Sequence, residues 1–180
     1  MTKFENAKNK IAEIVSKSEA NTDLGHSLNT LEWLLKLRPD ADEILQLAAL
    51  SHDIERGTPD PVHSSKFESY NAYKVAHAVR GAKMAEQIAK DVGYSDEEAK
   101  RLAYLVEHHE TGNDDPDVNV IMDADSISFF DYNIEAYLKY VGEKQTKKKI
   151  LFMKSRASEN AKKFIDEIMK NKPELNKLFN

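Results

Sequence analysis

The chain has 180 residues, 41% of them hydrophobic, which is enough to bury one core but short for two domains. Its formal net charge of −5 argues against a dedicated nucleic-acid or membrane-surface protein, because both classes usually carry an excess of basic residues. It contains no cysteine, and this excludes disulfides, thiolate metal ligands and a cysteine nucleophile.

The first part of the chain shows apolar residues at helical spacing, and residues 4–15 form the first predicted helix. Asp23 is a candidate N-cap for a second helix, which Pro39 ends. We expect the apolar face of this second helix to carry Leu24, Leu28, Leu31 and Leu35. A third helix is predicted over residues 41–54, and the loop that follows it is rich in helix breakers.

Helical patterns resume after this loop. A fourth helix is predicted over residues 69–91, with Gly93 behind its C-terminal end. Ser95 and Glu98 match a capping box, because a serine three residues before a glutamate can satisfy free amide groups at a helix start. This capping box opens a fifth predicted helix, which ends near residue 109.

A sixth predicted helix contains residues 118–125 and follows an acidic turn. The last part of the chain is basic, and residues 134–169 are predicted to form one or two long helices. Pro173 suits the first turn of a short final helix. No segment alternates with period two for long enough to predict a strand. The sequence therefore predicts an all-α fold, a bundle of about eight helices that forms a single domain over residues 1–180.

The histidines are distributed unevenly, since all of them lie in the first 110 residues. They are His26, His52, His63, His77, His108 and His109. Any one of them alone is more typical of a hydrogen-bonded core residue, but most of the set falls near alternating ends of successive predicted helices. In an antiparallel bundle such ends converge at one pole, where side chains from distant helices can build a metal site.

A metal ion would also explain why the apolar run over residues 47–54 contains His52 and Asp53. Burying these two side chains without partners would be unfavourable by several kcal/mol, and coordination supplies the missing compensation. Imidazole and carboxylate ligands together suit Mn, Fe, Co, Ni or Zn.

The order His26, then His52-Asp53, then Asp125 resembles the HD superfamily of metal-dependent phosphohydrolases. The stretch HAVRGAKMAEQIAKDVGYSDEEAKRLAYLVEHHETG is similar to the second half of many HD domains. The resemblance covers residues 20–132, and the basic helical part over residues 133–180 follows it. It implies an HD-domain-like helical bundle.

The resemblance also implies a set of metal ligands. One divalent transition-metal ion would be held by His26, His52, Asp53 and Asp125. Members of the superfamily that hold two ions use two further histidines, for which His77 and His109 are the matching residues here. In those members the aspartate of the HD pair lies between the two ions, so the number of ions, one or two, stays open.

Two of these ligands have close competitors. Asp123 competes with Asp125, and His108 competes with His109. Neighbours this close on a helix point in different directions, so only one of each pair can face the site. The alanine before Asp125 and the HETG sequence that begins at His109 resemble the superfamily patterns, and they favour these two residues.

The implied reaction is hydrolysis of a phosphoester or phosphoanhydride bond, because a divalent ion lowers the pKa of water and withdraws charge from phosphoryl oxygens. Asp53 and Glu110 are the candidate catalytic residues, the latter as a proton acceptor or as the group that orients His109. Candidate phosphate-binding cations are Arg56, Arg80, Lys83, Lys154 and Arg156. His63 lies in the breaker-rich loop and is not expected to bind metal, though it could touch substrate.

The implied partner is a small phosphorylated substrate, either nucleotide-like or a phosphomonoester. The residues after the HD pair match none of the superfamily's named activities, so they do not identify it. One alternative is a catalytically silent HD domain that binds metal and a nucleotide or a partner. Another is a helical interaction module that binds no metal.

Other partners are not expected. The N-terminal residues lack an apolar signal segment and no apolar run approaches membrane-spanning length, so we expect a cytoplasmic protein without membrane contact. The lysine-rich stretch over residues 143–163 lacks the interleaved aromatic residues of single-strand binders, which argues against nucleic acid. The sequence leaves the oligomeric state open.

Overall fold

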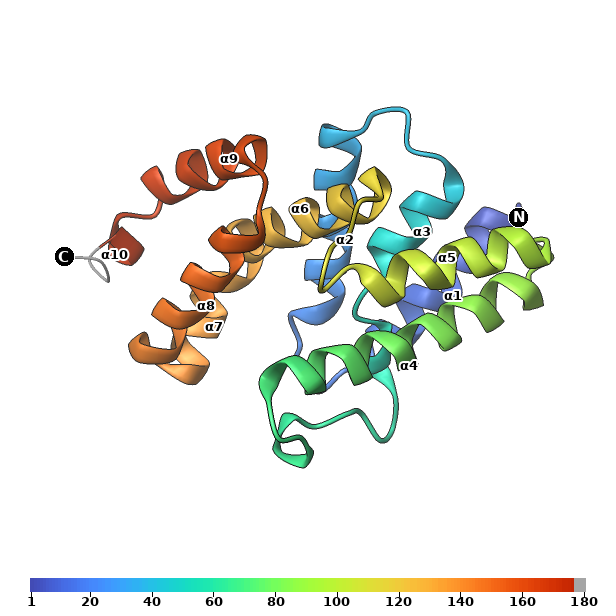
Figure 1. Ribbon diagram of the computed structural model, residues 1–180, viewed down its shortest axis with the longest axis horizontal. Coiled ribbons are helices and arrows are strands. Elements are labelled where there is room, and N and C mark those ends of the chain that lie inside the picture. The colour runs from blue at the N-terminus through green and yellow to red at the C-terminus, as the bar shows by residue number, and fades with distance from the viewer. Residues whose placement is uncertain (177–180) are drawn as a thin grey trace.

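The computed structural model describes residues 1–176, and this part of the chain is all-helical, with no strand (Figure 1). The predicted fold class is therefore confirmed. Its α-helices are α1 (Lys3–Val15), α2 (Asp23–Leu37), α3 (Glu43–Ser51), α4 (Tyr70–Asp91), α5 (Asp96–His108), α6 (Pro116–Ser128), α7 (Ile134–Val141), α8 (Glu143–Arg156), α9 (Glu159–Lys170) and α10 (Pro173–Asn176). Among the helices described, none is both long and apolar enough to cross a bilayer.

Three short segments join these helices. η1 (Ile54–Gly57) and η2 (Ser64–Lys66) are single 3₁₀ turns between α3 and α4, whereas η3 (Phe129–Asn133) is a π-helical turn. Because η3 connects α6 directly to α7, these two helices and the π turn form one continuous helical path. A π turn is rare and is often found beside a functional site.

The helices α1 to α6 enclose the main core, and α7 to α10 lie to one side of it (Figure 1). α4 packs along α5, α2 packs against α6, and α3 contacts both α2 and α5. The core between them is built from fully buried aliphatic side chains, among them Leu34, Leu47, Leu50, Leu102, Leu105 and Ile121. α3 is buried on nearly every side, and its C-terminal end therefore delivers His52 and Asp53 into the interior.

The predicted helix boundaries agree closely with the structure where capping residues mark them. Ser95 and Glu98 form the expected capping box at the start of α5. Ser69 caps α4, and Gly93 follows that helix with a positive φ of 94°. The predicted N-cap of α2 is wrong by one residue, because Thr22 occupies the cap position and Asp23 is the first helical residue.

The predicted apolar face of α2 is also wrong. Of the four leucines predicted to form this face, only Leu31 is buried, while Leu28 is 43% and Leu35 is 37% exposed. The buried face instead consists of Asp23, His26, Ser27, Thr30, Leu31, Trp33 and Leu34. The helix is rotated in this way because its polar stripe packs against α6, where His26 finds its partners.

Two further segments differ from the prediction. The third helix is shorter than residues 41–54, since α3 ends at Ser51 and the chain turns into η1. The basic region over residues 134–169 forms three helices rather than one or two. Gly142, with a φ of 79°, separates α7 from α8, and Ser158 caps the start of α9. The short final helix begins at Pro173, as expected.

Gly57, at the end of η1, lies against the backbone of α1, and we expect its replacement by alanine to destabilise the fold. A Cβ atom there would lie 2.0 Å from the carbonyl oxygen of Ile14. We expect a loss of about 3 kcal/mol and a Tm lower by about 6–12 °C, measured by circular dichroism. Gly81→Ala is the control, because its Cβ would meet nothing closer than 3.6 Å and should leave stability unchanged or higher. Equal melting curves for the two variants would contradict this account.

Candidate metal centre

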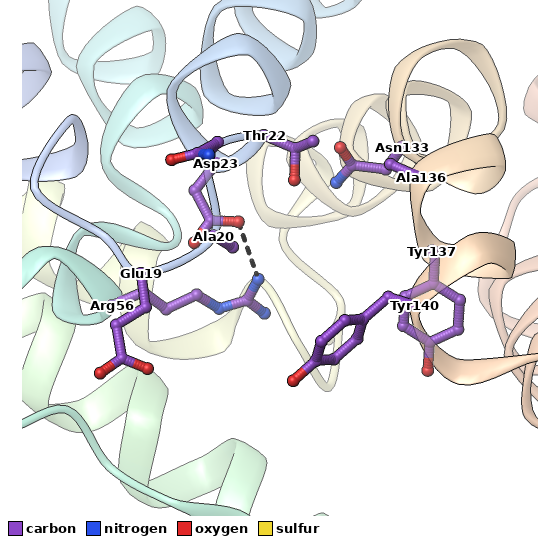
Figure 2. A pocket seen from close by; sticks show the side chains of 10 residues that line it. Glu19, Ala20, Thr22, Asp23, Arg56, Asn133, Ala136, Tyr137 and Tyr140 are labelled. Carbon is purple, nitrogen blue, oxygen red and sulfur yellow. Dashed lines mark ion pairs between the residues drawn. The ribbon is translucent and has the colours of Figure 1, made fainter.

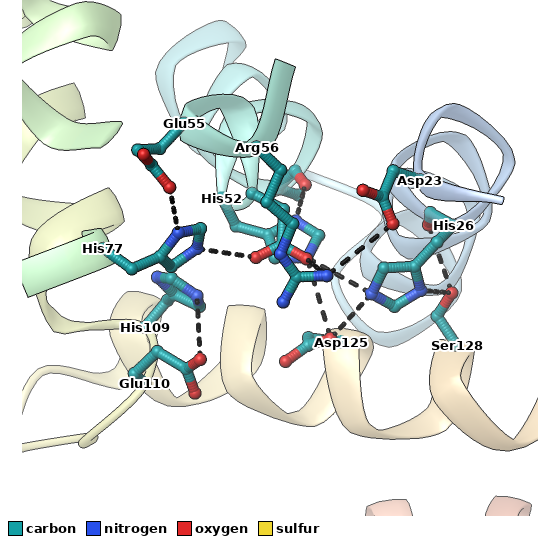
Figure 3. Close-up of polar contacts among 12 residues, drawn as sticks. Asp23, His26, His52, Glu55, Arg56, His77, His109, Glu110, Asp125 and Ser128 are labelled. Carbon is teal, nitrogen blue, oxygen red and sulfur yellow. Dashed lines mark hydrogen bonds and ion pairs between the residues drawn. The ribbon is translucent and has the colours of Figure 1, made fainter. Parts of the chain in front are cut away.

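Five helical segments bring histidine and aspartate side chains together in the interior (Figure 3). The residues that converge are His26 of α2, His52 and Asp53 after α3, His77 of α4, His109 after α5, and Asp125 of α6. Each of them is at least 93% buried. The sequence-predicted ligands therefore lie in one place, although nearly one hundred residues separate the first from the last.

His26, His52 and Asp125 form the tightest group, in which one ligand atom from each side chain lies within 4.8 Å of the others. The Nε2 atom of His26 is 2.9 Å from Asp125 Oδ1 and 3.3 Å from the Nε2 atom of His52. Two imidazole nitrogens and one carboxylate oxygen are donors that divalent transition metals accept. This buried group could hold a metal ion.

Asp53 lies between this group and the remaining histidines. Its Oδ2 atom is 3.5 Å from His52 Nε2 and 3.0 Å from Arg56 Nη1, while its Oδ1 atom is 2.9 Å from His77 Nε2. The ring of His109 stands 5.3 Å from the ring of His52 and 6.5 Å from that of His77. The two oxygens of one carboxylate thus face two different histidines, His52 and His77.

All four buried histidines are held in the same way, through their Nδ1 atoms. These bonds join His26 to Ser128 Oγ (2.9 Å), His52 to the Ala49 carbonyl (2.8 Å), His77 to Glu55 Oε2 (2.8 Å) and His109 to the Val106 carbonyl (2.6 Å). Carbonyl and carboxylate oxygens only accept, so the imidazoles donate with Nδ1–H. The hydroxyl of Ser128 donates to the carbonyl of His26, and it therefore also accepts from the ring.

This arrangement turns the Nε2 atoms of the four rings toward the interior. The Nε2 atom of His109 is buried and has no hydrogen-bond partner. Burial lowers the pKa of this ring to about 4, so it is neutral near pH 7. The Nε2 atoms of His26 and His52 lie 3.3 Å apart, and both face the Asp125 carboxylate, at 2.9 Å and 3.7 Å from its Oδ1 atom. Metal-binding histidines have this pattern, with Nδ1 held by a neighbouring acceptor and Nε2 left for the ion.

The two aspartates are ionised. Burial opposes their charge, but Arg56 with His52 and His77 lowers the pKa of Asp53 well below its usual value. Arg156 with His26 and His52 does the same for the pKa of Asp125. Burial also opposes a charge on His77, yet hydrogen bonds to Asp53 and Glu55 raise its pKa to about 9. The His77 ring is therefore protonated near pH 7 and donates to both carboxylates.

Glu110 faces the same interior but is already paired. Its carboxylate forms ion pairs with Lys74 and with Arg156, the second at 2.7 Å. Against the effect of burial, His109, Arg156 and Lys74 lower the pKa of Glu110 to about 2. Its Oε1 atom is 4.0 Å from the Nε2 atom of His109, so it does not hold the Nδ1 side of that ring.

The predicted phosphate-binding cations divide into two groups. Arg56 and Arg156 lie at the centre, where Arg56 pairs with Asp53 and Arg156 contacts Asp125, Glu110 and Ser126. The other three lie outside it. Arg80 binds the carbonyl of Asp60 (2.5 Å) and approaches Glu55 (3.5 Å), Lys83 is exposed on α4, and Lys154 pairs with Asp166 (2.7 Å).

Helix geometry explains why Lys83 and Lys154 miss the centre. Lys83 follows His77 by six residues and so points about 120° away from it around α4. Lys154 precedes Arg156 by two residues on α8, a separation of about 160–200° around the helix axis, and only Arg156 faces inward. These two residues do not contact the buried groups anywhere in residues 1–176, and their assignment to a phosphate clamp is not supported.

The competing ligand candidates are separated by the same kind of geometry. His108 stacks on Tyr104, with ring centroids 4.3 Å apart, and it donates to the Tyr104 carbonyl outside the centre. Asp123 accepts two hydrogen bonds from Ser158, from its amide at 2.8 Å and from its hydroxyl at 2.5 Å. His63 is exposed at the start of η2. His109 and Asp125 are thus the members of each pair that face the centre.

We expect Asp123→Ala to affect mainly the stability of the protein and Asp125→Ala to affect mainly its metal content. Loss of Asp123 removes the contact that fixes the cap of α9 and should lower stability by about 1 kcal/mol, with metal content unchanged. Loss of Asp125 should remove most of the bound metal. Metal content by plasma mass spectrometry and melting curves of both variants test this. A metal loss in Asp123→Ala would mean that the wrong aspartate has been assigned.

Glu55, Ser128 and Lys74 also shape the site, and the sequence did not identify them as part of it. Glu55 holds His77, and its Oε1 atom accepts from the amide of Val62 at 2.6 Å. Ser128 lies three residues after Asp125, on the same face of α6. The three-residue spacing between Asp125 and Ser128 could have identified Ser128 in the sequence. Glu55 lies in a 3₁₀ turn, which a search for helical periodicity does not detect.

The metal centre opens into further cavities. A space of about 110 Å³ is lined by His26, Asp53, Arg56, Tyr70, Glu110, Asp125, Phe129, Asn133, Tyr137, Lys149 and Met153. It shares Arg56, Asn133 and Tyr137 with a larger cavity of about 560 Å³ (Figure 2). Figure 2 shows the guanidinium of Arg56 on one side of the larger cavity and the rings of Tyr137 and Tyr140 on the other. The larger cavity therefore lies next to the buried histidine and aspartate residues.

Comparisons with known proteins find relatives that match part of this chain. Over 80 residues, or 44% of this chain, it is 26% identical to the bifunctional uridylyltransferase/uridylyl-removing enzyme of Bradyrhizobium diazoefficiens. Over 78 residues, or 43% of the chain, it is 31% identical to the enzyme of the same name from Rhodopseudomonas palustris. The matched part spans 7% of the length of each of these relatives. No solved structure matches the chain significantly.

One family matches almost the whole chain, over residues 2–179. This range includes every helix described above and all the side chains of the candidate metal centre. The chain belongs to the family described as "Domain of unknown function (DUF4202)".

Proposed function

We propose that this protein is a metal-dependent phosphohydrolase of the HD superfamily. It cleaves a phosphoester or phosphoanhydride bond of a small phosphorylated substrate, either nucleotide-like or a phosphomonoester. The observation that carries the proposal is the common orientation of four buried histidines. Each ring is held through its Nδ1 atom by a neighbouring oxygen and turns its Nε2 atom toward the interior where Asp53 and Asp125 lie.

The residues fit one or two divalent transition-metal ions. His26, His52, Asp53 and Asp125 would hold the first, and His77, His109 and Asp53 would hold a second. When bound, such an ion lowers the pKa of water and withdraws charge from phosphoryl oxygens. Arg156 forms an ion pair with Asp125, and Glu55 accepts a hydrogen bond from His77. These contacts hold the two side chains in place before an ion or substrate binds.

The relatives support a reaction at a phosphate group. They are named for transferring and removing a uridylyl group, and both steps make or break a bond to phosphorus. The neighbouring cavity of about 560 Å³ is within the usual range for small-molecule sites, which suits a substrate of nucleotide size. Amide, hydroxyl and aromatic groups line it together with Arg56 and the carboxylates of Glu19 and Asp23.

A catalytically silent HD domain that binds metal and nucleotide is the second candidate. The pairing of Glu110 with Lys74 and Arg156 favours it, because a carboxylate with a pKa of about 2 is a weak proton acceptor. In the phosphohydrolase, Glu110 instead keeps Arg156 and Lys74 in position, and Asp53 remains the candidate catalytic carboxylate.

The test is hydrolysis of a panel of nucleotides and synthetic phosphoesters, with Mn, Fe, Co, Ni or Zn added to tag-free protein. We expect phosphate release with at least one of these ions and its loss in the presence of a chelator. The His109→Ala variant should lose activity at least about tenfold, whereas His108→Ala should retain it. Metal binding without turnover of any substrate in the panel would favour the silent domain, and absence of metal binding would contradict both candidates.

A further inference from the structure

The cations around the metal centre differ in whether they have an acidic partner. Arg56 pairs with Asp53 and Asp23, Arg156 with Asp125 and Glu110, and Lys74 with Glu110. Lys149 of α8 lines the same 110 Å³ cavity. Within residues 1–176 its ammonium group makes no ion pair and no hydrogen bond.

The surroundings of Lys149 are aromatic. Its Nζ atom lies 5.5 Å from the centre of the Phe152 ring and 5.8 Å from that of Phe129. Lys149 also lines a second cavity of about 400 Å³, together with Tyr70, Tyr137, Gln145, Lys148 and Phe152. It therefore stands where the metal centre meets an outer space that is open to small molecules.

An ammonium group without a partner is unfavourable in such a place. Removal from water raises its free energy, and ring faces compensate only part of this. Burial lowers the pKa of Lys149 to about 8, yet the charged form still predominates at neutral pH. A residue that only supported the fold would be better placed with a carboxylate. An unpaired cation beside a catalytic cavity is instead typical of a group whose partner is the ligand.

We propose that Lys149 binds a phosphoryl oxygen of the substrate in the 110 Å³ cavity that Arg56 also lines. This inference rests on the proposed function and adds a residue that the sequence did not single out. The side chain of Arg56 is 35% exposed, and its five N–H donors exceed what its two carboxylate partners occupy. Lys149 supplies a compact charge with three donors, and together the two residues bind a phosphate dianion.

The experiment measures binding of inorganic phosphate by calorimetry, with metal-loaded and with metal-free protein. We expect Lys149→Met to raise the dissociation constant for phosphate about ten- to a hundredfold. Lys147→Met is the matched control, because Lys147 is exposed on the same helix and lines none of these cavities. Lys149→Arg keeps the charge and should restore part of the affinity.

A second readout separates binding from structural support. Because Lys149→Met removes an unpaired charge, its Tm should be unchanged or higher and its metal content unchanged. Equal phosphate affinity in the Lys149→Met and Lys147→Met variants overturns the inference. So does a lower Tm with loss of metal, which would show that Lys149 supports the fold. If phosphate binds through Lys149 but no phosphoester is hydrolysed with any metal, the proposed function fails and the anion site remains.

Discussion

Replacement of Asp53 by asparagine is expected to abolish most of the activity and to strip metal from the protein. We expect the rate of phosphoester hydrolysis to fall at least about a thousandfold, which corresponds to an activation free energy higher by about 4 kcal/mol. Metal content should fall at least about tenfold. No other single substitution in the chain is expected to affect the site more.

The reason is the central position of this carboxylate. Its two oxygens face different histidines, at 3.5 Å from His52 and 2.9 Å from His77, so one side chain serves both groups of ligands. An amide has a similar shape but no charge, and its nitrogen is not a metal ligand. The substitution therefore removes the negative charge and one of the two ligand oxygens without opening a hole in the core.

The assay uses the substrate and metal that give the fastest turnover by the wild-type protein. Asp60→Asn is the control, because Asp60 is exposed in the nearby loop and its substitution makes the same chemical change away from the buried residues. Circular dichroism of both variants verifies that the helical fold is retained. Asp53→Asn with wild-type metal content and turnover would show that the buried cluster is not the metal site.

Metal addition is expected to raise the thermal stability of the protein strongly. At a free ion concentration about one hundred times the dissociation constant, binding stabilises the folded state by about 2.7 kcal/mol. For a chain of this size that corresponds to a Tm higher by about 5–10 °C. Scanning calorimetry with Mn, Fe, Co, Ni and Zn, each against a chelator, measures the shift and ranks the ions.

The physical basis of this shift is the interior of the metal-free protein. His26 and His52 present Nε2 atoms to each other at 3.3 Å, and the Nε2 atom of His109 is buried without a partner. An ion satisfies these atoms at once, and the unfolded chain has no such preformed site. Asp53→Asn should show little or no shift. An equal rise in both proteins would point to binding elsewhere on the chain.

The sequence was sufficient for the fold class and for the residues that meet at the centre. Helix ends marked by Ser69, Gly93 and Ser95 were placed well, because capping residues act locally. The order of His26, His52-Asp53 and Asp125 was enough to identify side chains that lie close together in the fold. The likeness to HD domains, and not hydropathy, carried this step.

Other features depended on tertiary contacts that a hydropathy pattern does not contain. The buried face of α2 includes Ser27 and Thr30, which a hydropathy pattern assigns to solvent. The order of lysines along α8 did not show that Lys149 and Arg156 face inward while Lys154 pairs with Asp166 at the surface. Glu55 was missed because it acts from a 3₁₀ turn.

The π-helical turn η3 has a consequence for how such a site can change. Asp125 lies before this turn, whereas Asn133 and Tyr137, which line both inner cavities, lie at its end and beyond it. A π turn holds one residue more than an α turn, so gain or loss of a single residue rotates everything after it by about 100°. One helical path thus joins the half that carries Asp125 to a half that lines the two cavities. A one-residue insertion or deletion in η3 would change the lining of these cavities while Asp125 and the residues before it keep their places.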